Sequence, residues 1–398
     1  MKVVQINAVC HSGSTGRIVD ELSKALNGED IDNIVAYADG VCNLENSIRI
    51  GNDLDHKFHA LFSRIFGLQG YFSHGATKRF IRFLDEYQPD IIHLHNLHSN
   101  YINLPMLFKY ISKNNIATVI TLHDCFFFTG KCVHYIIAGC NRWQEKCGNC
   151  LQLESGNASW FFDRTFKMLN DRKHWYQMCS RLGIIGVSNW ITGEARKSVL
   201  RVANKVQTIY NWIDMDIFYP HESDIRKRLG ISNKYLVLGV ASLWDDTKGI
   251  DDFNQIADML DDRFKVVIVG TCKEKLNNKI LKISQTDDID MLSDLYADAD
   301  VFYNPTRRET FGKVTAEALA CGTPVITYDT TACTELVADN CGYIEKIGDI
   351  KAVYNDILNI IDSNIDYETN CRKFARDNFD KEKCLNQTIE FYKELLDD

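Results

Sequence analysis

The chain lacks any long hydrophobic segment. No run of about eighteen apolar residues occurs in its 398 residues, so the sequence predicts no transmembrane helix. Gln5 and Asn7 interrupt the first apolar stretch, where a signal peptide would need an unbroken hydrophobic core. We therefore expect a cytoplasmic protein, with peripheral attachment to the inner membrane face as a possibility that a later segment raises.

The C-terminal half lacks enough positive charge to balance its acidic residues. Residues 201–398 hold 24 Lys and Arg against 36 Asp and Glu, a net charge of −12, whereas residues 1–200 hold 21 against 18, a net charge of +3; the two sum to −9. A protein that binds nucleic acid needs a basic stripe, and none appears in this half. Nucleic acid is therefore not expected as a partner. The difference in charge predicts different ligands for the two halves.

The chain also lacks internal repeats and low-complexity linkers, and its length suits two cores of nearly equal size. Apolar runs rich in β-formers alternate with helical patterns throughout. Runs buried on both faces and separated by helix-length spacers predict an α/β fold with two doubly wound parallel sheets, each Rossmann-like. The ten predicted strands are 3–9, 33–38, 90–95, 118–123, 182–187, 206–210, 235–240, 264–269, 301–303 and 325–328.

Three segments divide the chain. Residues 1–204 are predicted to form a first Rossmann-like domain, residues 205–378 a second one, and residues 379–398 a C-terminal helix. That helix is amphipathic, because apolar side chains recur at helical spacing at Leu385, Ile389, Tyr392 and Leu395.

Two glutamates eight positions apart occupy the most informative stretch, Ala299–Tyr328. Within it, Pro305 ends a strand, Gly312 opens a helix, and Gly322-Thr323-Pro324 ends that helix before the next strand. The free N–H groups of the helix start, near Thr310, Phe311 and Gly312, favour a phosphate or a sugar oxygen. Glu309 and Glu317 can therefore address two parts of one ligand, although glutamates near helix starts also occur simply because they offset the helix dipole.

The same stretch resembles the signature of glycosyltransferase family 4, retaining enzymes of the GT-B fold that include bacterial exopolysaccharide, capsule and O-antigen glycosyltransferases. The resemblance implies two Rossmann-like domains that face a cleft, with the acceptor on the first and the donor on the second. It places the donor sugar against Glu309 and the ribose against Glu317. The implied partners are a nucleotide-diphosphate sugar and a saccharide or lipid-linked saccharide acceptor, with no cofactor for catalysis. Residues 379–398 would cross back to the first domain.

A glycine-containing turn follows the first strand, at Cys10–Arg17. Gly13 and Gly16 suit a phosphate-binding turn before a helix, although His11 stands where a dinucleotide fingerprint has its first glycine. A tight strand-to-helix turn without a ligand explains the same glycines. In the family, the corresponding loop approaches the donor diphosphate, where Arg17 would add a charge-assisted bond.

Lys248, in the segment Ser242–Gly249, is the predicted diphosphate partner on the second domain. The family usually carries an arginine a few residues earlier, and this chain has none there; Arg307 and Arg308 are possible substitutes or solvated surface. A second departure is Trp212, which occupies the place of a family glycine.

Four histidines lie near the ends of two predicted strands: His93, His95, His98 and His123. Ligands of open parallel sheets bind outside the carboxyl ends of strands, so His95 and His123 are candidates, and His93 is predicted to be core. The resemblance places His123 near the transferred sugar. Asp124 could orient its imidazole or help to deprotonate the acceptor hydroxyl.

Five cysteines crowd into residues 125–150, which we call the cysteine loop. Cys132, Cys140, Cys147 and Cys150, the last two as C-x-x-C, could hold a structural tetrahedral Zn²⁺. Free thiols are the alternative. Most of the chain's fourteen cysteines are expected to be reduced, because no export signal is evident.

Acidic residues are absent from His56–Leu84, which carries five Lys and Arg and seven Phe and Tyr. Cations interleaved with aromatics at helical spacing suit an anionic membrane surface. A helix with core aromatics and solvated cations explains the pattern equally well.

The sequence thus predicts a retaining glycosyltransferase in surface polysaccharide synthesis. It would move a sugar from a nucleotide-diphosphate donor to an acceptor that is either a saccharide or a lipid-linked saccharide. Two alternatives stay open. One is a sugar-nucleotide epimerase of the same fold, and the other is a non-catalytic scaffold that only binds nucleotide.

Overall fold

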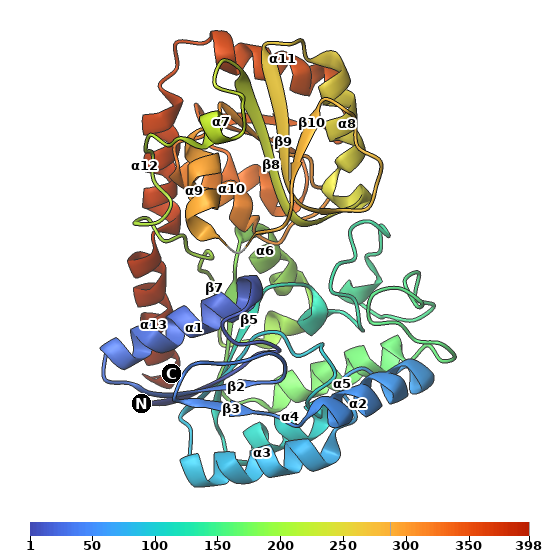
Figure 1. The fold of residues 1–398 in the computed structure, drawn as a ribbon. Coiled ribbons are helices and arrows are strands. Elements are labelled where there is room, and N and C mark those ends of the chain that lie inside the picture. The colour runs from blue at the N-terminus through green and yellow to red at the C-terminus, as the bar shows by residue number, and fades with distance from the viewer. Residues whose placement is uncertain (287, 398) are drawn as a thin grey trace. The chain divides into compact units, whose positions relative to one another are not determined.

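The computed structural model describes residues 1–286 and 288–397, and the chain divides into two compact units. Unit 1 comprises Met1–Ile209 together with the C-terminal residues from Leu385 onward. Unit 2 comprises Tyr210–Cys384. Figure 1 shows a strand layer with helices beside it in each unit.

Unit 1 is built on a seven-stranded parallel sheet with the order β3-β2-β1-β4-β5-β6-β7. Its strands are β1 (Lys2–Ile6), β2 (Asp32–Tyr37), β3 (Ser47–Arg49), β4 (Ile91–Leu94), β5 (Ala117–Leu122), β6 (Leu182–Gly186) and β7 (Lys205–Thr208). The helices between them are α1 (Gly13–Gly28), α2 (Asp53–Phe66), α3 (His74–Tyr87), α4 (Leu104–Lys113), α5 (Thr165–Met178) and α6 (Asn189–Lys197). Every residue of β4, β5 and β6 is buried, as the continuous apolar runs predict.

Unit 2 is built on a six-stranded parallel sheet with the order β10-β9-β8-β11-β12-β13. Its strands are β8 (Tyr235–Trp244), β9 (Phe264–Cys272), β10 (Ile280–Ile283), β11 (Val301–Asn304), β12 (Val325–Tyr328) and β13 (Gly342–Glu345). Its helices are α7 (Ile225–Arg228), α8 (Ile250–Met259), α9 (Ile289–Ala297), α10 (Lys313–Ala320), α11 (Ile350–Asp362) and α12 (Tyr367–Phe379).

The predicted fold class is confirmed, and all ten predicted strands form. Three strands escaped the sequence analysis: β3, β10 and β13. Each lies at an edge of its sheet, where one side is open and a continuous apolar run is not needed. The predicted strand at 206–210, which the sequence analysis placed in the second domain, is β7, and it pairs with β6 inside unit 1.

The C-terminal helix α13 (Lys381–Asp397) has the predicted apolar stripe. Its residues from Leu385 onward belong to unit 1, and Leu385, Ile389, Tyr392 and Leu395 are all buried. The Tyr392 hydroxyl lies 2.6 Å from Nδ1 of His93, which is a core residue as predicted. This helix completes the core of unit 1.

The order of strands reverses at one place in each sheet. In unit 1 the chain moves outward in opposite directions from β1 and β4, and in unit 2 from β8 and β11. Open parallel sheets bind ligands outside the carboxyl ends of strands at such a switch point. The loops after these four strands are therefore where a site is expected.

No helix in the described parts of the chain is both long and apolar enough to cross a membrane.

Packing under α13 gives a stability prediction. A Cβ at Gly183 would lie 2.6 Å from the Phe391 ring and 2.9 Å from a Leu395 methyl group, whereas a Cβ at Gly193 in α6 would meet nothing within 4 Å. We expect Gly183→Ala to lower the free energy of unfolding by about 1–3 kcal/mol through overpacking. The matched change Gly193→Ala should raise it by about 0.5–1 kcal/mol, because alanine favours the helix. Urea unfolding of both variants tests this, and equal effects would contradict the packing.

Candidate active site

The loop after β8 holds Lys248 in a fixed position. The Asp245 carboxylate accepts the backbone N–H groups of Thr247 at 2.9 Å and Lys248 at 3.1 Å. Gly249, which follows, has φ +74°, and a Cβ there would collide with the carbonyl oxygen of Pro305. Glycine is therefore required where this loop meets the loop after β11.

A backbone hydrogen bond joins the same two loops. The Arg307 N–H donates to the Thr247 carbonyl oxygen at 2.8 Å, and the Thr306 hydroxyl lies 3.4 Å from that oxygen. Since β8 and β11 flank the switch point of unit 2, the two loops form one continuous edge at the carboxyl ends of the strands.

Lys248 and Glu309 form an ion pair on this edge, with the Lys248 ammonium bonded to Oε1 of Glu309. Both side chains are partly exposed. The Glu309 N–H donates to the Thr331 hydroxyl at 2.8 Å, which fixes the backbone of the glutamate. The sequence analysis selected both residues but not their pairing, because 61 positions separate them.

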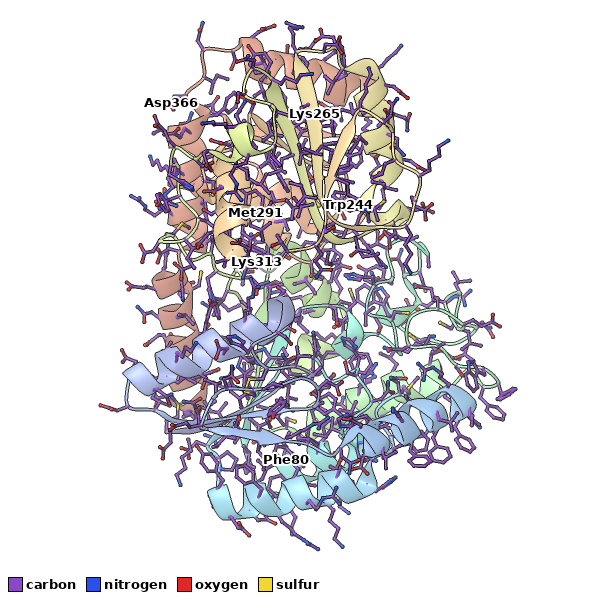
Figure 2. The ribbon with its side chains drawn as sticks, viewed as in Figure 1. Phe80, Trp244, Lys265, Met291, Lys313 and Asp366 are labelled. Carbon is purple, nitrogen blue, oxygen red and sulfur yellow. A yellow bond between two sulfur atoms is a disulfide. The ribbon has the colours of Figure 1, made fainter. Side chains whose placement is uncertain are left out.

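Helix α10 begins directly after this pair. Gly312, at φ +94°, precedes it, and Lys313, labelled in Figure 2, is its first residue. No side-chain hydrogen bond caps the helix start, as an anion site there would require. The Phe311 ring is buried 6.0 Å from the ring of Tyr210 and 5.4 Å from that of Phe379, so it anchors the turn; Thr310 is partly buried.

Glu317 lies one turn into α10 and is almost fully buried. The Tyr296 hydroxyl donates to its Oε2 at 3.1 Å. Burial, followed by the charge of Glu317, raises the pKa of Tyr296 well above its usual value, so the phenol stays a donor. Tyr296 therefore orients the carboxylate, a role that the sequence analysis did not identify.

Arg307, one of the two suggested substitutes for the missing family arginine, is engaged by groups of unit 2. Its guanidinium bonds the buried carboxylate of Asp252 at 2.5 Å and the Pro305 carbonyl oxygen at 2.6 Å. Arg307 thus braces α8 against the loop after β11. Arg308 is half-buried and remains a candidate, and Trp212 is buried.

In unit 1, the loop after β1 has the predicted strand-to-helix turn. His11 at φ +65° and Gly13 at φ +67° both adopt left-handed backbone conformations, and a Cβ at Gly13 would meet nothing within 4 Å. Gly16 packs tightly, since its Cβ would lie 3.2 Å from the His11 nitrogen. Helix α1 starts at Gly13 with no side-chain cap, and Arg17 is half-buried in its first turn. The open turn suits close approach of a ligand.

A disulfide joins Cys10 of this loop to Cys42, and the other twelve cysteines, all in the described part of the chain, form no disulfide. The sequence analysis did not single out this pair.

The strand-end histidines gather as expected, but their partners differ. Nδ1 of His95 lies 3.0 Å from Nε2 of His123, so one ring donates to the other. Burial lowers the pKa of His123 to about 4 and that of His95 well below its usual value. Both imidazoles are therefore neutral near pH 7, and His123 is a hydrogen-bonding group rather than a proton acceptor tuned to neutrality.

Asp124 pairs with His98, with Oδ2 2.9 Å from Nε2, and its other oxygen accepts the Phe126 N–H at 2.7 Å. Burial alone would lower the pKa of His98, but the charge of Asp124 and the hydrogen bonds of the ring together outweigh burial, so the pKa is raised. The sequence analysis assigned Asp124 to His123, its neighbour in sequence. The structure shows Asp124 paired with His98, and the Asp124 charge also acts on His123.

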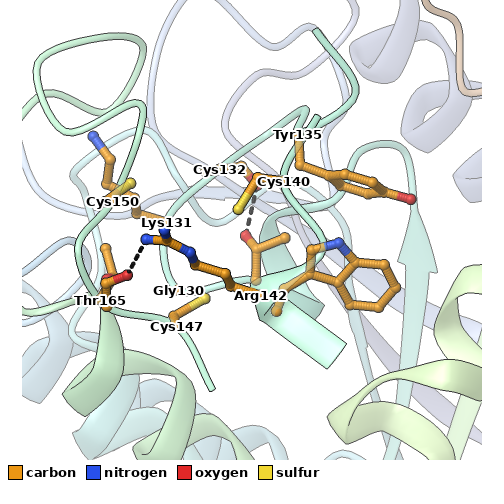
Figure 3. A pocket seen from close by; sticks show the side chains of 12 residues that line it. Gly130, Lys131, Cys132, Tyr135, Cys140, Arg142, Cys147, Cys150 and Thr165 are labelled. Atoms are coloured by element: carbon orange, nitrogen blue, oxygen red, sulfur yellow. Dashed lines mark hydrogen bonds between the residues drawn. The ribbon is translucent and has the colours of Figure 1, made fainter. Parts of the chain in front are cut away.

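The cysteine loop surrounds a separate cavity in unit 1 (Figure 3). A thiol–thiol hydrogen bond joins Cys132 and Cys150. This bond lowers the pKa of Cys150 to about 6, and the bond together with burial raises the pKa of Cys132. Among the described residues, no three His, Cys, Asp or Glu side chains lie close enough to hold a metal ion. The cavity is lined by Thr129, Gly130, Lys131, Cys132, Tyr135, Cys140, Arg142, Trp143, Cys147, Gly148, Cys150 and Thr165.

Comparison with known proteins decides the family. The model described as Glycosyltransferase Family 4 matches residues 15–217, and that described as Glycosyl transferases group 1 matches residues 234–363. The chain belongs to glycosyltransferase family 4. The resemblance of Ala299–Tyr328 is thus confirmed at the level of the family.

The similarity of this chain to individual known proteins extends over large parts of their lengths, but the sequence identities are low. The N-acetyl-alpha-D-glucosaminyl L-malate synthase of Bacillus anthracis is 24% identical over 54% of this chain and 60% of its own length. An uncharacterized 41.2 kDa protein in the cps region of Klebsiella pneumoniae is 24% identical over 76% of this chain and 78% of its own. The Anabaena HepE protein, solved with UDP and glucose, superposes with a TM-score of 0.70 over 99% of this chain and 100% of that one, at 16% identity. The fold is therefore GT-B.

Burial of the neutral histidines predicts a pH dependence. An unfolded chain binds protons below pH 6.5 that folded His123, with its pKa near 4, cannot bind. The free energy of unfolding should therefore fall by about 1.4 kcal/mol per pH unit, for each such histidine, as the pH falls from 6.5 toward 4. His123→Gln removes one contribution and should flatten the dependence, whereas a change at the exposed His174 should not. Urea unfolding at several pH values measures this; parallel curves for all three proteins would contradict the assignment.

Proposed function

We propose that the protein is a retaining glycosyltransferase that moves a sugar from a nucleotide-diphosphate donor to a saccharide acceptor in surface polysaccharide synthesis. The observation that carries the proposal is the Lys248–Glu309 ion pair beside the uncapped start of α10, at the switch point of unit 2. A cation, a helix start without a side-chain cap and a carboxylate on one edge match a diphosphate followed by a hexose. Family membership and the polysaccharide-region relative support the same activity.

In unit 2 we assign the donor contacts by charge. Lys248 and the N–H groups of Thr310, Phe311 and Gly312 would receive the diphosphate, whose negative charge grows as the glycosidic bond breaks. Glu309 would then accept hydrogen bonds from the hydroxyls of the transferred sugar. Glu317, oriented by Tyr296, would accept the ribose hydroxyls.

In unit 1 we assign His123 to a hydroxyl of the transferred sugar. Its depressed pKa keeps the ring neutral, so it can hydrogen-bond without placing a second positive charge near the developing oxocarbenium ion. Gly13, Gly16 and Arg17 are proposed to serve the diphosphate, because the turn is open at Gly13 and an uncapped helix follows. We expect these cations and backbone N–H groups to neutralise the leaving diphosphate without a metal ion.

The ion pair makes a two-part prediction. Glu309→Gln should lower kcat/KM for transfer by about 10²-fold or more, because the sugar loses a charged hydrogen-bond acceptor. The same change frees the Lys248 ammonium, so affinity for the nucleoside diphosphate alone should stay equal or rise. Lys248→Ala should weaken nucleoside diphosphate binding. Screening sugar nucleotides by thermal shift identifies the donor, after which calorimetry and transfer assays measure both effects.

The matched control is Glu274→Gln, an exposed glutamate of unit 2, which should leave both binding and transfer unchanged. Full transfer by Glu309→Gln would contradict the proposal. A changed sugar nucleotide formed in the absence of any acceptor would instead identify an epimerase.

We also propose that Cys132, Cys140, Cys147 and Cys150 close on one structural Zn²⁺. Four thiols line one cavity, and Lys131 ties the surrounding loop to the carbonyl oxygens of Leu153, Ser155 and Asn157 at 2.6–3.2 Å. Binding would require the sulfur atoms to draw closer than they lie here. A closed four-thiolate site leaves no position for substrate, so the metal would stabilise the loop only.

Elemental analysis tests the zinc proposal. We expect about one zinc per chain. The double change Cys147→Ser and Cys150→Ser should remove it, whereas Cys272→Ser in unit 2 should not. Folded protein purified without metal, and unable to take up added Zn²⁺, would overturn the proposal.

We further propose that the acceptor is lipid-linked and is reached at a membrane surface. The support comes from α2, most of which lies in the basic aromatic segment 56–84. The phenylalanines of α2 are exposed. The other half of that segment behaves as core, since Phe80 and Leu84 of α3 are buried.

A further inference from the structure

Helix α2 is turned with its apolar face outward. Phe58, Phe62 and Phe66 recur every four residues and are all exposed, Phe58 by 56%. A neighbouring face of the helix buries His59, which is 1% exposed, and also His56 and Ser63. A soluble helix normally shows the reverse pattern, so this apolar stripe calls for a partner.

Specific hydrogen bonds hold α2 in this orientation. The two ring nitrogens of His56 lie 3.1 Å from the Asp39 carboxylate and 2.8 Å from the Ile50 carbonyl oxygen. Nδ1 of His59 lies 2.8 Å from the Ser73 hydroxyl, and the Asn52 side chain caps the helix start. Rotating the apolar stripe inward would break these bonds. The outward orientation is therefore a property of the fold.

A second aromatic segment, Trp160–Phe162, lies against the end of α2. The backbone N–H of Trp160 donates to the Arg64 carbonyl oxygen at 2.7 Å. A Cβ at Gly67 would collide with the Phe162 carbonyl oxygen. Trp160 is 53% exposed and Phe161 68%. We call Phe58, Phe62, Phe66, Trp160, Phe161 and Phe162 together the aromatic surface.

Cations accompany this surface. Arg64 is exposed on α2, and the Arg164 guanidinium lies 5.5 Å from the centre of the Phe162 ring. Lys146 lies over the Phe166 ring at 5.1 Å. The nearby Asp163 carboxylate accepts the Cys150 N–H at 2.7 Å and the Thr165 N–H at 2.9 Å, so local hydrogen bonds engage it.

We infer that the aromatic surface seats unit 1 on an anionic lipid bilayer, with its rings at the boundary between headgroups and acyl chains. Phenylalanine and tryptophan rings with lysine and arginine beside them match both layers of such an interface. A symmetric dimer through the same surface would bring the cations of both copies together, which is unfavourable. The inference deepens the proposed function and rests on it only in that a lipid-linked acceptor would be presented there.

Vesicle co-sedimentation of the full chain tests the inference. We compare vesicles of phosphatidylcholine alone with vesicles that also contain phosphatidylglycerol. Wild type should bind the anionic vesicles more tightly, and added salt should weaken that binding. The variant Phe62→Ser, Phe161→Ser should lose about tenfold or more in affinity, because two exposed rings no longer enter the interface. Arg64→Gln, Arg164→Gln should reduce the preference for anionic vesicles.

Val41→Ser is the matched control, since Val41 is an exposed apolar residue of unit 1 outside the aromatic surface, and it should bind like wild type. Unchanged binding by the Phe62, Phe161 variant, or no binding by wild type at low salt, would overturn the inference. Self-association of wild type that this variant abolishes, without vesicle binding, would identify a second copy as the partner and also overturn it. Hydrolysis of the donor without vesicles should be equal in wild type and variant. Its absence from both, with vesicle binding intact, would count against the proposed transferase and leave the docking surface standing.

Discussion

The contact between the loops after β8 and β11 is the constraint on which the candidate site of unit 2 depends. Gly249 reaches the Pro305 carbonyl because it lacks a side chain, and the backbone bond from Arg307 to Thr247 closes the contact. Two strands adjacent in the sheet thus bring together residues that are far apart in sequence. The flexible lysine at position 248 is fixed at its backbone by the preceding turn, so only its side chain remains to respond to a ligand.

Desolvation has a complementary role in unit 1. Histidines that follow β4 and β5 are buried deeply enough to stay neutral, and one hydrogen bond joins the rings of His95 and His123. The Asp124 carboxylate, next to His123 in the sequence, is engaged by His98. The His95–His123 pair is therefore polar but uncharged, and it differs chemically from the charged Lys248–Glu309 pair of unit 2.

The sequence was most informative where a local pattern is sufficient. Continuous apolar runs identify the central strands, because those strands are buried on both faces, and spacing identifies the buried stripe of α13. The glycines at positions 13 and 312 mark turns that need a positive φ. The short edge strands β3, β10 and β13 were missed, since an edge strand is only partly buried and its residues show no clear alternation.

By itself, the sequence determined the class of the fold and the residue types of the candidate site. Strands buried on both faces and the starts of helices can both be identified from residues that are close together in the sequence. Only the tertiary structure decided which charged side chains form pairs: Lys248 with Glu309, Arg307 with Asp252, and His98 with Asp124. It also decided that α2 turns its phenylalanines outward, since periodicity defines the two faces of a helix but not which face the rest of the protein can satisfy. For α2 that choice was made by Asp39 and Ser73, polar partners distant in sequence that hold the histidine face inside.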